Sequence, residues 1–166
     1  CTGIIDFPAV CEVLSKLIHE KFNGSEVKLQ HEVLGFEKST DSTTVITNKG
    51  KYTARYIVNC SGLQSDRIAK KDQMDPGMKI VGFRGDYYEL TPEAQHKVKH
   101  LIYPVPNPQF PFLGVHFTRM IHHPTECGPN AVFVFKREGY GKTDFSLGDT
   151  MDALSYGGTW KLFFKH

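Results

Sequence analysis

The stretch that decides the fold is YIVNCSGLQSDRIAKK, residues 56–71. It opens with a short apolar run, Tyr56–Cys60, of the kind that forms a buried strand. Ser61-Gly62 follows, and small residues at the end of a strand let a phosphate or nucleotide approach backbone N–H groups. A helix is expected from about Gln64 to Lys71. This order is typical of a nucleotide-binding domain, although such a turn taken alone is more often an ordinary tight turn.

A helix is predicted near the start of the chain. Asp6 can cap it, Pro8 is tolerated in its first turn, and apolar residues recur between Val10 and Phe22 at the spacing of one helix face. Asn23-Gly24 supplies a stop signal. We therefore expect one helix that ends at this pair.

Extended segments lie on both sides of the 56–71 stretch. Upstream, a run through Val33 precedes a β-branched strand at 43–47, a hairpin turn at 48–51 and a return strand at 52–55. Downstream, we expect strands at 80–90, 113–118 and 131–136. Between the first two of these we expect a short helix or irregular segment at 93–100 and a proline-rich loop at 101–113. Near the end we expect a helix at 149–155 capped by Asp149, and a break at Gly157-Gly158 before a terminal apolar segment.

This order predicts an α/β plus α+β architecture, with part of a nucleotide-binding domain joined to an antiparallel-sheet substrate domain. Residues 1–75 are expected to form the partial nucleotide-binding domain and residues 76–148 the substrate-binding sheet domain. Residues 149–166 are expected to begin a truncated helical segment. Both termini read as interior sequence, so the chain is expected to be an internal fragment of a longer protein.

The composition is that of an ordinary globular protein, since 40% of the 166 residues are hydrophobic and 23% are charged. The formal net charge of +2 is too balanced to favour nucleic acid or a polybasic membrane surface as a partner. No apolar run approaches the ~20 residues of a membrane span. The four cysteines are scattered, which indicates reduced thiols in a cytosolic setting.

Four polar side chains in the second half carry candidate chemistry. Arg84, beside a glycine and near two tyrosines, can hold a carboxylate through a two-pronged hydrogen bond, or it can be a surface arginine paired with Asp86. His116 can take a proton at neutral pH, although a lone histidine is more often a hydrogen-bonded core residue. Asn130 and Arg137, at the two ends of a predicted strand, can serve a pocket or belong to turn and edge chemistry.

Three other patterns fail on spacing. The segment Gly141-Lys142-Thr143 lacks the upstream glycine of a phosphate-binding loop, because Lys136 stands in its place. The histidines and the cysteine between residues 116 and 127 do not match paired zinc-ligand spacing, so no metal site is predicted. The G-x-S-x-G elbow of serine hydrolases is absent.

Several motifs, in their order along the chain, carry a family resemblance. They are Thr2–Asp6, Asn59–Arg67, Phe83–Tyr87, His100–Pro106, Phe110–Thr118, Gly128–Val132 and Lys136–Tyr140. Over nearly its whole length the chain resembles the L-2-hydroxyglutarate oxidase/dehydrogenase family, a branch of the D-amino-acid-oxidase-like, FAD-dependent oxidoreductases. The family's N-terminal G-x-G-x-x-G element and C-terminal flavin segment are absent from the chain, and Ile121–Cys127 replaces an expected glycine-containing hairpin turn.

The resemblance implies an FAD-binding domain with a Rossmann-like core and an antiparallel substrate domain over the flavin. It implies FAD-dependent oxidation of L-2-hydroxyglutarate to 2-oxoglutarate, with electrons passed to oxygen or a quinone, while the fragment alone is expected to be inactive. The expected location is cytoplasmic, with peripheral association at the inner face of the membrane left open, and no nucleic acid is expected as a partner. The alternatives are another superfamily member, of glycerol-3-phosphate or amino-acid oxidase type, and a cofactor-less domain without catalysis.

The resemblance also implies roles for particular residues. His116 is expected to be the catalytic base. The expected substrate-binding residues are Arg84, Tyr87, Tyr103, Thr118, Asn130 and Arg137. Two arginines among them suit a dicarboxylate, which needs two anion-binding regions. The expected cofactor-binding residues, near the adenosine side of FAD, are Val33, Cys60, Ser61, Gly62 and Leu63.

Overall fold

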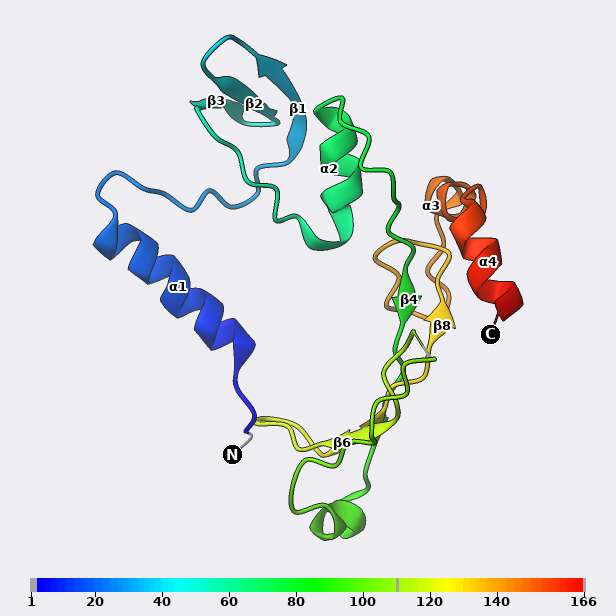
Figure 1. The fold of residues 1–166 in the computed structure, drawn as a ribbon. Helices are drawn as coiled ribbons and strands as arrows, with labels where there is room; N and C mark the ends of the chain where they lie inside the picture. The colour runs from blue at the N-terminus through cyan, green and yellow to red at the C-terminus, as the bar shows by residue number, and fades with distance from the viewer. Residues whose placement is uncertain (1–2, 110, 166) are drawn as a thin grey trace. The chain divides into compact units, whose positions relative to one another are not determined.

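The computed structural model describes residues 3–109 and 111–165 (Figure 1). The chain divides into two compact units, one made of residues 1–27 with 83–133 and the other of residues 28–82 with 134–166. Each unit therefore combines segments that are distant in sequence. Four residues named in the sequence motifs or expectations, Cys1, Thr2, Phe110 and His166, lie outside the described residues.

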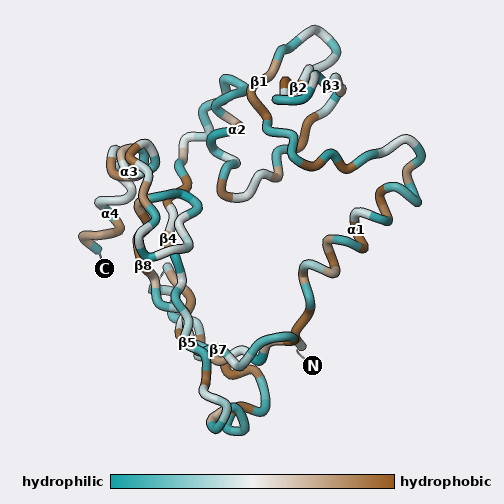
Figure 2. The backbone as a smooth tube through the Cα atoms, turned by 180° about the vertical axis from the view of Figure 1, so that it is seen from behind, coloured by the Kyte–Doolittle hydropathy of each residue, from teal (hydrophilic) through white to brown (hydrophobic). Residues whose placement is uncertain are grey.

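The first unit begins with helix α1, Phe7–Lys21, as predicted. Asp6 caps it, because its Oδ1 accepts a hydrogen bond from the backbone N–H of Ala9 at 3.2 Å. The helix ends just before Asn23-Gly24, where Gly24 takes a φ of 82° that glycine adopts at little cost. Apolar bands recur along α1 in Figure 2, as the sequence spacing requires.

The first unit also contains two small antiparallel sheets. They are β4 (Phe83–Arg84) with β8 (Val132–Phe133), and β5 (Tyr88–Glu89), β7 (Glu126–Gly128) and β6 (His116–Thr118) in that spatial order. The strand predicted at 80–90 is split in two, because β4 pairs with β8 whereas β5 pairs with β7. The short helix η2, Pro92–Lys97, overlaps the segment 93–100 where a short helix or an irregular stretch is predicted.

The second unit contains a three-stranded antiparallel sheet in the order β1 (Val33–Lys38), β2 (Thr43–Thr47), β3 (Gly50–Ala54). The predicted strand at 43–47 and the hairpin after it are confirmed. The short helix η1 (Gly62–Gln64) leads into α2 (Ser65–Lys71), which lies beside β1 in Figure 1. The predicted helix from about Gln64 to Lys71 is therefore confirmed as well.

The buried strand predicted at Tyr56–Cys60 is wrong. This segment has no regular secondary structure, and the side chains of Tyr56 and Val58 are 89% and 83% exposed. A buried strand needs backbone hydrogen bonds to strands beside it. None of the strands in residues 3–109 and 111–165 pairs with this run, so its apolar side chains stay in contact with solvent.

Two helices complete the second unit, α3 (Leu147–Leu154) and α4 (Gly157–Lys165). The predicted Asp149 cap is wrong, since the Oγ of Ser146 accepts the hydrogen bond from the backbone N–H of Asp149. The carboxylate of Asp149 instead accepts from Nη2 of Arg67 and from the backbone N–H of Arg137. Gly157-Gly158 opens α4 instead of separating it from α3, so the break falls at Ser155 and Tyr156.

Polar residues are prominent among the best-buried side chains of the described ranges. The buried apolar residues there are Val98 and Val134, whereas the buried polar and charged residues are Asp66, His116, Thr125, Arg137, Thr150 and Thr159. Buried polar groups are stable only when they are hydrogen-bonded or ion-paired. The histidine lies in the first unit and the Asp66–Arg137 pair in the second.

Candidate functional site

His116 lies at the start of β6, where it pairs with Gly128 of β7, and it is 7% exposed. Its Nδ1 lies 2.9 Å from the carbonyl oxygen of Gly114. A carbonyl only accepts hydrogen bonds, so Nδ1 carries a proton in this contact. In the neutral ring, Nε2 is then the nitrogen with a free lone pair, which is the arrangement that a general base requires.

Aromatic side chains hold the imidazole of His116 in place. The ring of Tyr103 stacks on it, with centroids 4.6 Å apart and an interplanar angle of 19°, and the ring of Tyr87 meets it edge-on at 6.1 Å. The hydroxyl of Tyr103 lies 3.4 Å from Oγ1 of Thr118. Partial burial and the nearby carboxylate of Glu126 raise the pKa of Tyr87, so its hydroxyl remains protonated at neutral pH.

Arg84 and Asn130 lie together at the end of the β4–β8 sheet. The Nε of Arg84 donates to Oδ1 of Asp86 at 2.6 Å. Asp86 in turn donates its backbone N–H to Oδ1 of Asn130 at 2.8 Å and accepts from the backbone N–H of Asn130 at 3.3 Å. Arg84 and Asn130 line a hollow of about 250 Å³ together with Phe112 and other mostly apolar residues.

The Arg84 and His116 clusters are joined by a close approach of two backbone segments. A Cβ atom built on Gly85 would lie 2.7 Å from Cβ of Pro129, and one built on Gly128 would lie 2.9 Å from the carbonyl oxygen of Asp86. Real Cβ atoms do not approach that closely, so only glycine lets the segments meet here. The first unit thus brings together the predicted residues Arg84, Tyr87, Tyr103, His116, Thr118 and Asn130.

A larger hollow of about 530 Å³ in the first unit adds residues that the sequence reasoning missed. Tyr103 and Thr118 line it, as do the segments Gly3–Pro8 and Arg119–His123. Nε2 of His122 lies 3.3 Å from Oδ2 of Asp6, the residue that caps α1, and both residues line this hollow. Tyr103 therefore stands between His116 and a cavity large enough for a small organic acid.

The predicted cofactor-side turn, residues 59–63, lies in the second unit and is exposed. Asn59 shapes it, because its Oδ1 accepts from the N–H and the hydroxyl of Ser61 and its Nδ2 donates to the carbonyl of Ser65. Gly62 has a φ of 52°, and no atom lies within 4 Å of the position that a Cβ would take. This open backbone fits the approach of a phosphate or nucleotide.

Val33 and Arg137 belong to the same unit as this turn. The carbonyl of Val33 accepts from Nζ of Lys71 at 2.5 Å, which ties β1 to the end of α2. Arg137 is 7% exposed and binds the carboxylates of Asp66 and Asp152. Arg137 is thus the one predicted substrate-side residue that lies in the second unit.

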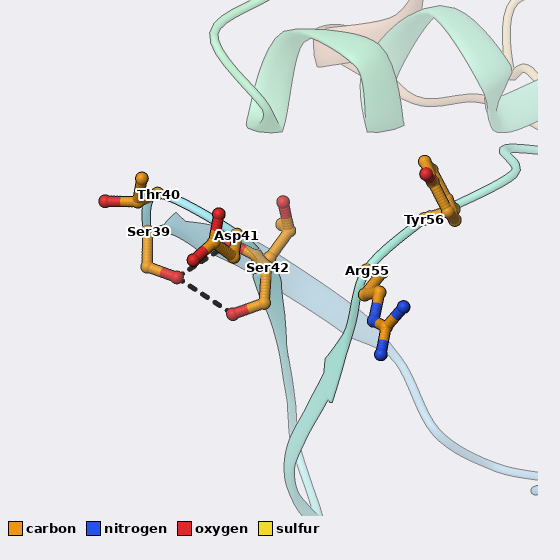
Figure 3. Close-up of a pocket in the computed structure, with 7 residues that line it drawn as sticks. Ser39, Thr40, Asp41, Ser42, Arg55 and Tyr56 are labelled. Carbon is orange, nitrogen blue, oxygen red and sulfur yellow. Dashed lines mark hydrogen bonds between the residues drawn. The ribbon is translucent and has the colours of Figure 1, made fainter.

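A polar hollow of about 640 Å³ opens at the β1–β2 turn (Figure 3), but none of the predicted site residues lines it. Ser39–Thr43, Arg55 and Tyr56 line it. The hydroxyls of Ser39 and Ser42 lie 2.8 Å apart and bond to each other. Among the residues that the structure describes, no group of three or more His, Cys, Asp or Glu side chains is arranged to hold a metal ion.

The family of the chain follows from comparison with known protein families. Residues 1–156 match the sequence pattern of the FAD dependent oxidoreductases. The chain belongs to the FAD dependent oxidoreductase family. The helices and antiparallel sheets of the structure are compatible with the α/β architecture expected for it.

The expected resemblance to L-2-hydroxyglutarate dehydrogenases within this FAD dependent oxidoreductase family is confirmed. Over 99% of its length the chain is 43% identical to that of Indibacter alkaliphilus, 41% identical to that of Escherichia coli K12 and 42% identical to the mitochondrial one of Bos taurus. It spans 41%, 39% and 38% of those relatives' lengths, respectively. No helix within the described ranges is long and apolar enough to cross a membrane.

Proposed function

We propose that the full-length protein containing this chain oxidises L-2-hydroxyglutarate to 2-oxoglutarate with FAD as its cofactor. The observation that carries the proposal is the 41–43% identity to L-2-hydroxyglutarate dehydrogenases over 99% of the chain. The first unit supports it with a guanidinium for a carboxylate, a histidine with one basic nitrogen and a cavity lined by Tyr103, whose ring stacks on that histidine.

The reaction removes a hydride from C2 of the substrate and a proton from its hydroxyl group. FAD, when bound, supplies the two-electron oxidant. His116 is the proposed acceptor of the hydroxyl proton, because the contact of Nδ1 with Gly114 leaves Nε2 as the accepting atom. The rings of Tyr103 and Tyr87 restrict the imidazole to this orientation. The electrons then pass to oxygen or to a quinone.

Arg84 is the proposed partner of a substrate carboxylate. Its Nε and Nη2 donate to the carboxylate of Asp86 at 2.6 and 3.4 Å, which fixes the plane of the guanidinium before the substrate arrives and lowers the entropic cost of binding. Asn130 contributes amide groups beside it, and the protonated hydroxyl of Tyr87 is a further donor. Tyr103 and Thr118 line the larger cavity. The substrate-binding role predicted for Arg137 stays a prediction.

Val33 and the turn Cys60–Leu63 are the proposed contacts with the adenosine side of FAD, supported by the open backbone at Gly62. We also propose that the chain is divided into a partial Rossmann-like FAD-binding domain (1–75), a substrate-binding sheet domain (76–148) and the start of a helical segment (149–166). The antiparallel pairing of the strands in 83–133 supports the second of these. The proposal also includes a cytoplasmic location, with association at the inner face of the membrane as the alternative.

The test is an absorbance spectrum of the purified full-length protein before and after anaerobic addition of L-2-hydroxyglutarate. A flavin band that bleaches with this substrate, and not with the D-enantiomer, supports both cofactor and substrate. Bleaching by glycerol 3-phosphate or an amino acid instead assigns the protein to another branch of the superfamily. Absence of flavin from the intact protein, even after incubation with FAD, overturns the proposal that the protein is an FAD-dependent enzyme.

A further inference from the structure

The side chain of Arg137 in the second unit is 4% exposed and makes several polar contacts. Nη1 and Nη2 together bind both carboxylate oxygens of Asp66, and Nη2 also donates to Oδ2 of Asp152 at 3.1 Å. Nη1 further donates to the carbonyl oxygen of Leu63 at 2.9 Å. A substrate carboxylate would have to displace Asp66 or Asp152 from these positions.

The charges around Arg137 are balanced. Asp66, Asp149 and Asp152 face Arg67, Lys79 and Arg137 through ion pairs of 2.5–3.7 Å and the shorter Asp66–Arg137 contact. Burial opposes ionisation of Asp66, but the hydrogen bonds from Arg137 and from the N–H of Ile80 outweigh it and hold its pKa below the ordinary value. Three carboxylates and three cations leave no surplus positive charge to attract an anionic substrate.

The cluster is built around the start of α2, directly after the cofactor-side turn. Asp66 accepts from the backbone N–H groups of Arg67 and Ile80, so it anchors the first turn of that helix. Nη1 of Arg137 donates to the carbonyl oxygen of Leu63, which precedes α2 in the chain. The next residue, Glu138, accepts from Nε2 of Gln64 at 2.6 Å. Residues 137 and 138 therefore hold two consecutive residues of the segment that follows Gly62.

We infer that Arg137 is a positioning residue for the cofactor-side turn 59–63, and not a ligand of the substrate. The inference rests on the proposed FAD-binding function. Asn59 bonds to Ser61 and Ser65, but the turn is exposed and contains a left-handed glycine, so side-chain packing does little to fix its backbone. A ligand that binds backbone N–H groups gains affinity when those groups are held in the bound geometry beforehand. Arg137, bonded to Leu63 and to Asp66, supplies that restraint.

The experiment compares Arg137→Lys with Arg84→Lys in the full-length protein. Lysine keeps the positive charge but loses the forked contact with Asp66 and the bond to Leu63. For Arg137→Lys we expect the Kd for FAD, from flavin fluorescence on the apoprotein, to rise about tenfold, the size of one lost buried hydrogen bond. The KM for L-2-hydroxyglutarate at saturating FAD should stay within about twofold. Arg84→Lys should show the opposite pattern, with an increased KM and an unchanged Kd for FAD.

A milder variant, Glu138→Ala, covers the case in which Arg137→Lys does not fold. It removes only the bond to Gln64, and it should speed hydrogen exchange of the amides of residues 61–64 in the apoprotein and weaken FAD binding about threefold. An increase in KM with unchanged FAD affinity in Arg137→Lys overturns the inference and restores the substrate role. Unchanged exchange and FAD affinity in Glu138→Ala also overturn it. Failure of the wild-type protein to bind FAD overturns the proposed function itself, so the two failures are distinguishable.

Discussion

Replacement of Asp66 by asparagine tests whether the buried ion pairs stabilise the second unit. The side chains of Asp66 and Arg137 are 3% and 4% exposed. Each oxygen of Asp66 accepts one hydrogen bond from Arg137 and one from a backbone N–H, of Arg67 or of Ile80. Asparagine offers one oxygen and one amide nitrogen, so whichever way it is turned, an NH₂ group faces two donors.

The expected cost is about 3–5 kcal/mol, the range for removing one partner of a buried ion pair. This is a large fraction of the ~5–15 kcal/mol by which a domain is usually stable. Among the residues that the structure describes, Asp152 is the carboxylate that still forms an ion pair with Arg137 in the variant. The free energy of opening is best read from hydrogen exchange of the amides in α2 and α3 of the full-length protein, since a global transition of a large protein is not two-state.

Asp41→Asn is the matched control, because Asp41 is exposed in the β1–β2 turn. It should change the opening free energy by no more than about 0.5 kcal/mol. A loss below about 1 kcal/mol in Asp66→Asn would refute the reasoning, since it would mean that the cluster is as well solvated as a surface ion pair.

Three further predictions concern pH, the base and backbone packing. The backbone N–H of Arg137 lowers the pKa of Asp149 below its ordinary value. The stability that Asp149 contributes to the second unit is therefore present above about pH 4 and is lost as pH falls through the folded pKa. In Asp149→Asn the loss of stability in acid should be smaller, as measured by hydrogen exchange. His116→Gln should lower kcat at neutral pH by about 10²–10⁴ in steady-state turnover with L-2-hydroxyglutarate. Gly128→Ala should destabilise the first unit by about 1–3 kcal/mol in the same exchange assay, because its Cβ would meet the backbone of Asp86.

The controls for these variants are equally specific. Gly148→Ala is matched to Gly128→Ala, because Gly148 lies in α3 with no atom within 4 Å of the Cβ position, and it should be neutral or stabilising. Equal effects of Gly128→Ala and Gly148→Ala on stability would contradict the interpretation that Gly128 is required for the close approach to Asp86. An acid profile of Asp149→Asn that matches the wild type, or a kcat of His116→Gln within about threefold of it, would remove the corresponding role.

The sequence by itself determined the elements whose causes are local. Asp6 and Asn23-Gly24 set the ends of α1, and the β-branched run at 43–47 with its turn set the hairpin. A cap or a tight turn depends on a few neighbouring residues, so its chemistry can be read directly from their order. The order of the motifs along the chain also indicates the family without any knowledge of tertiary contacts.

Only the tertiary structure decided which residues act together. Tyr56–Cys60 has the composition of a buried strand, but a strand exists only where another strand pairs with it, and composition does not report that. Ser146 caps α3, whereas the carboxylate of Asp149 accepts from the side chain of Arg67 and the backbone N–H of Arg137. Arg137 was predicted to bind substrate, whereas in the structure it binds Asp66, 71 positions earlier in the chain. Pairings at that separation depend on how the whole chain packs, which local sequence preference does not encode.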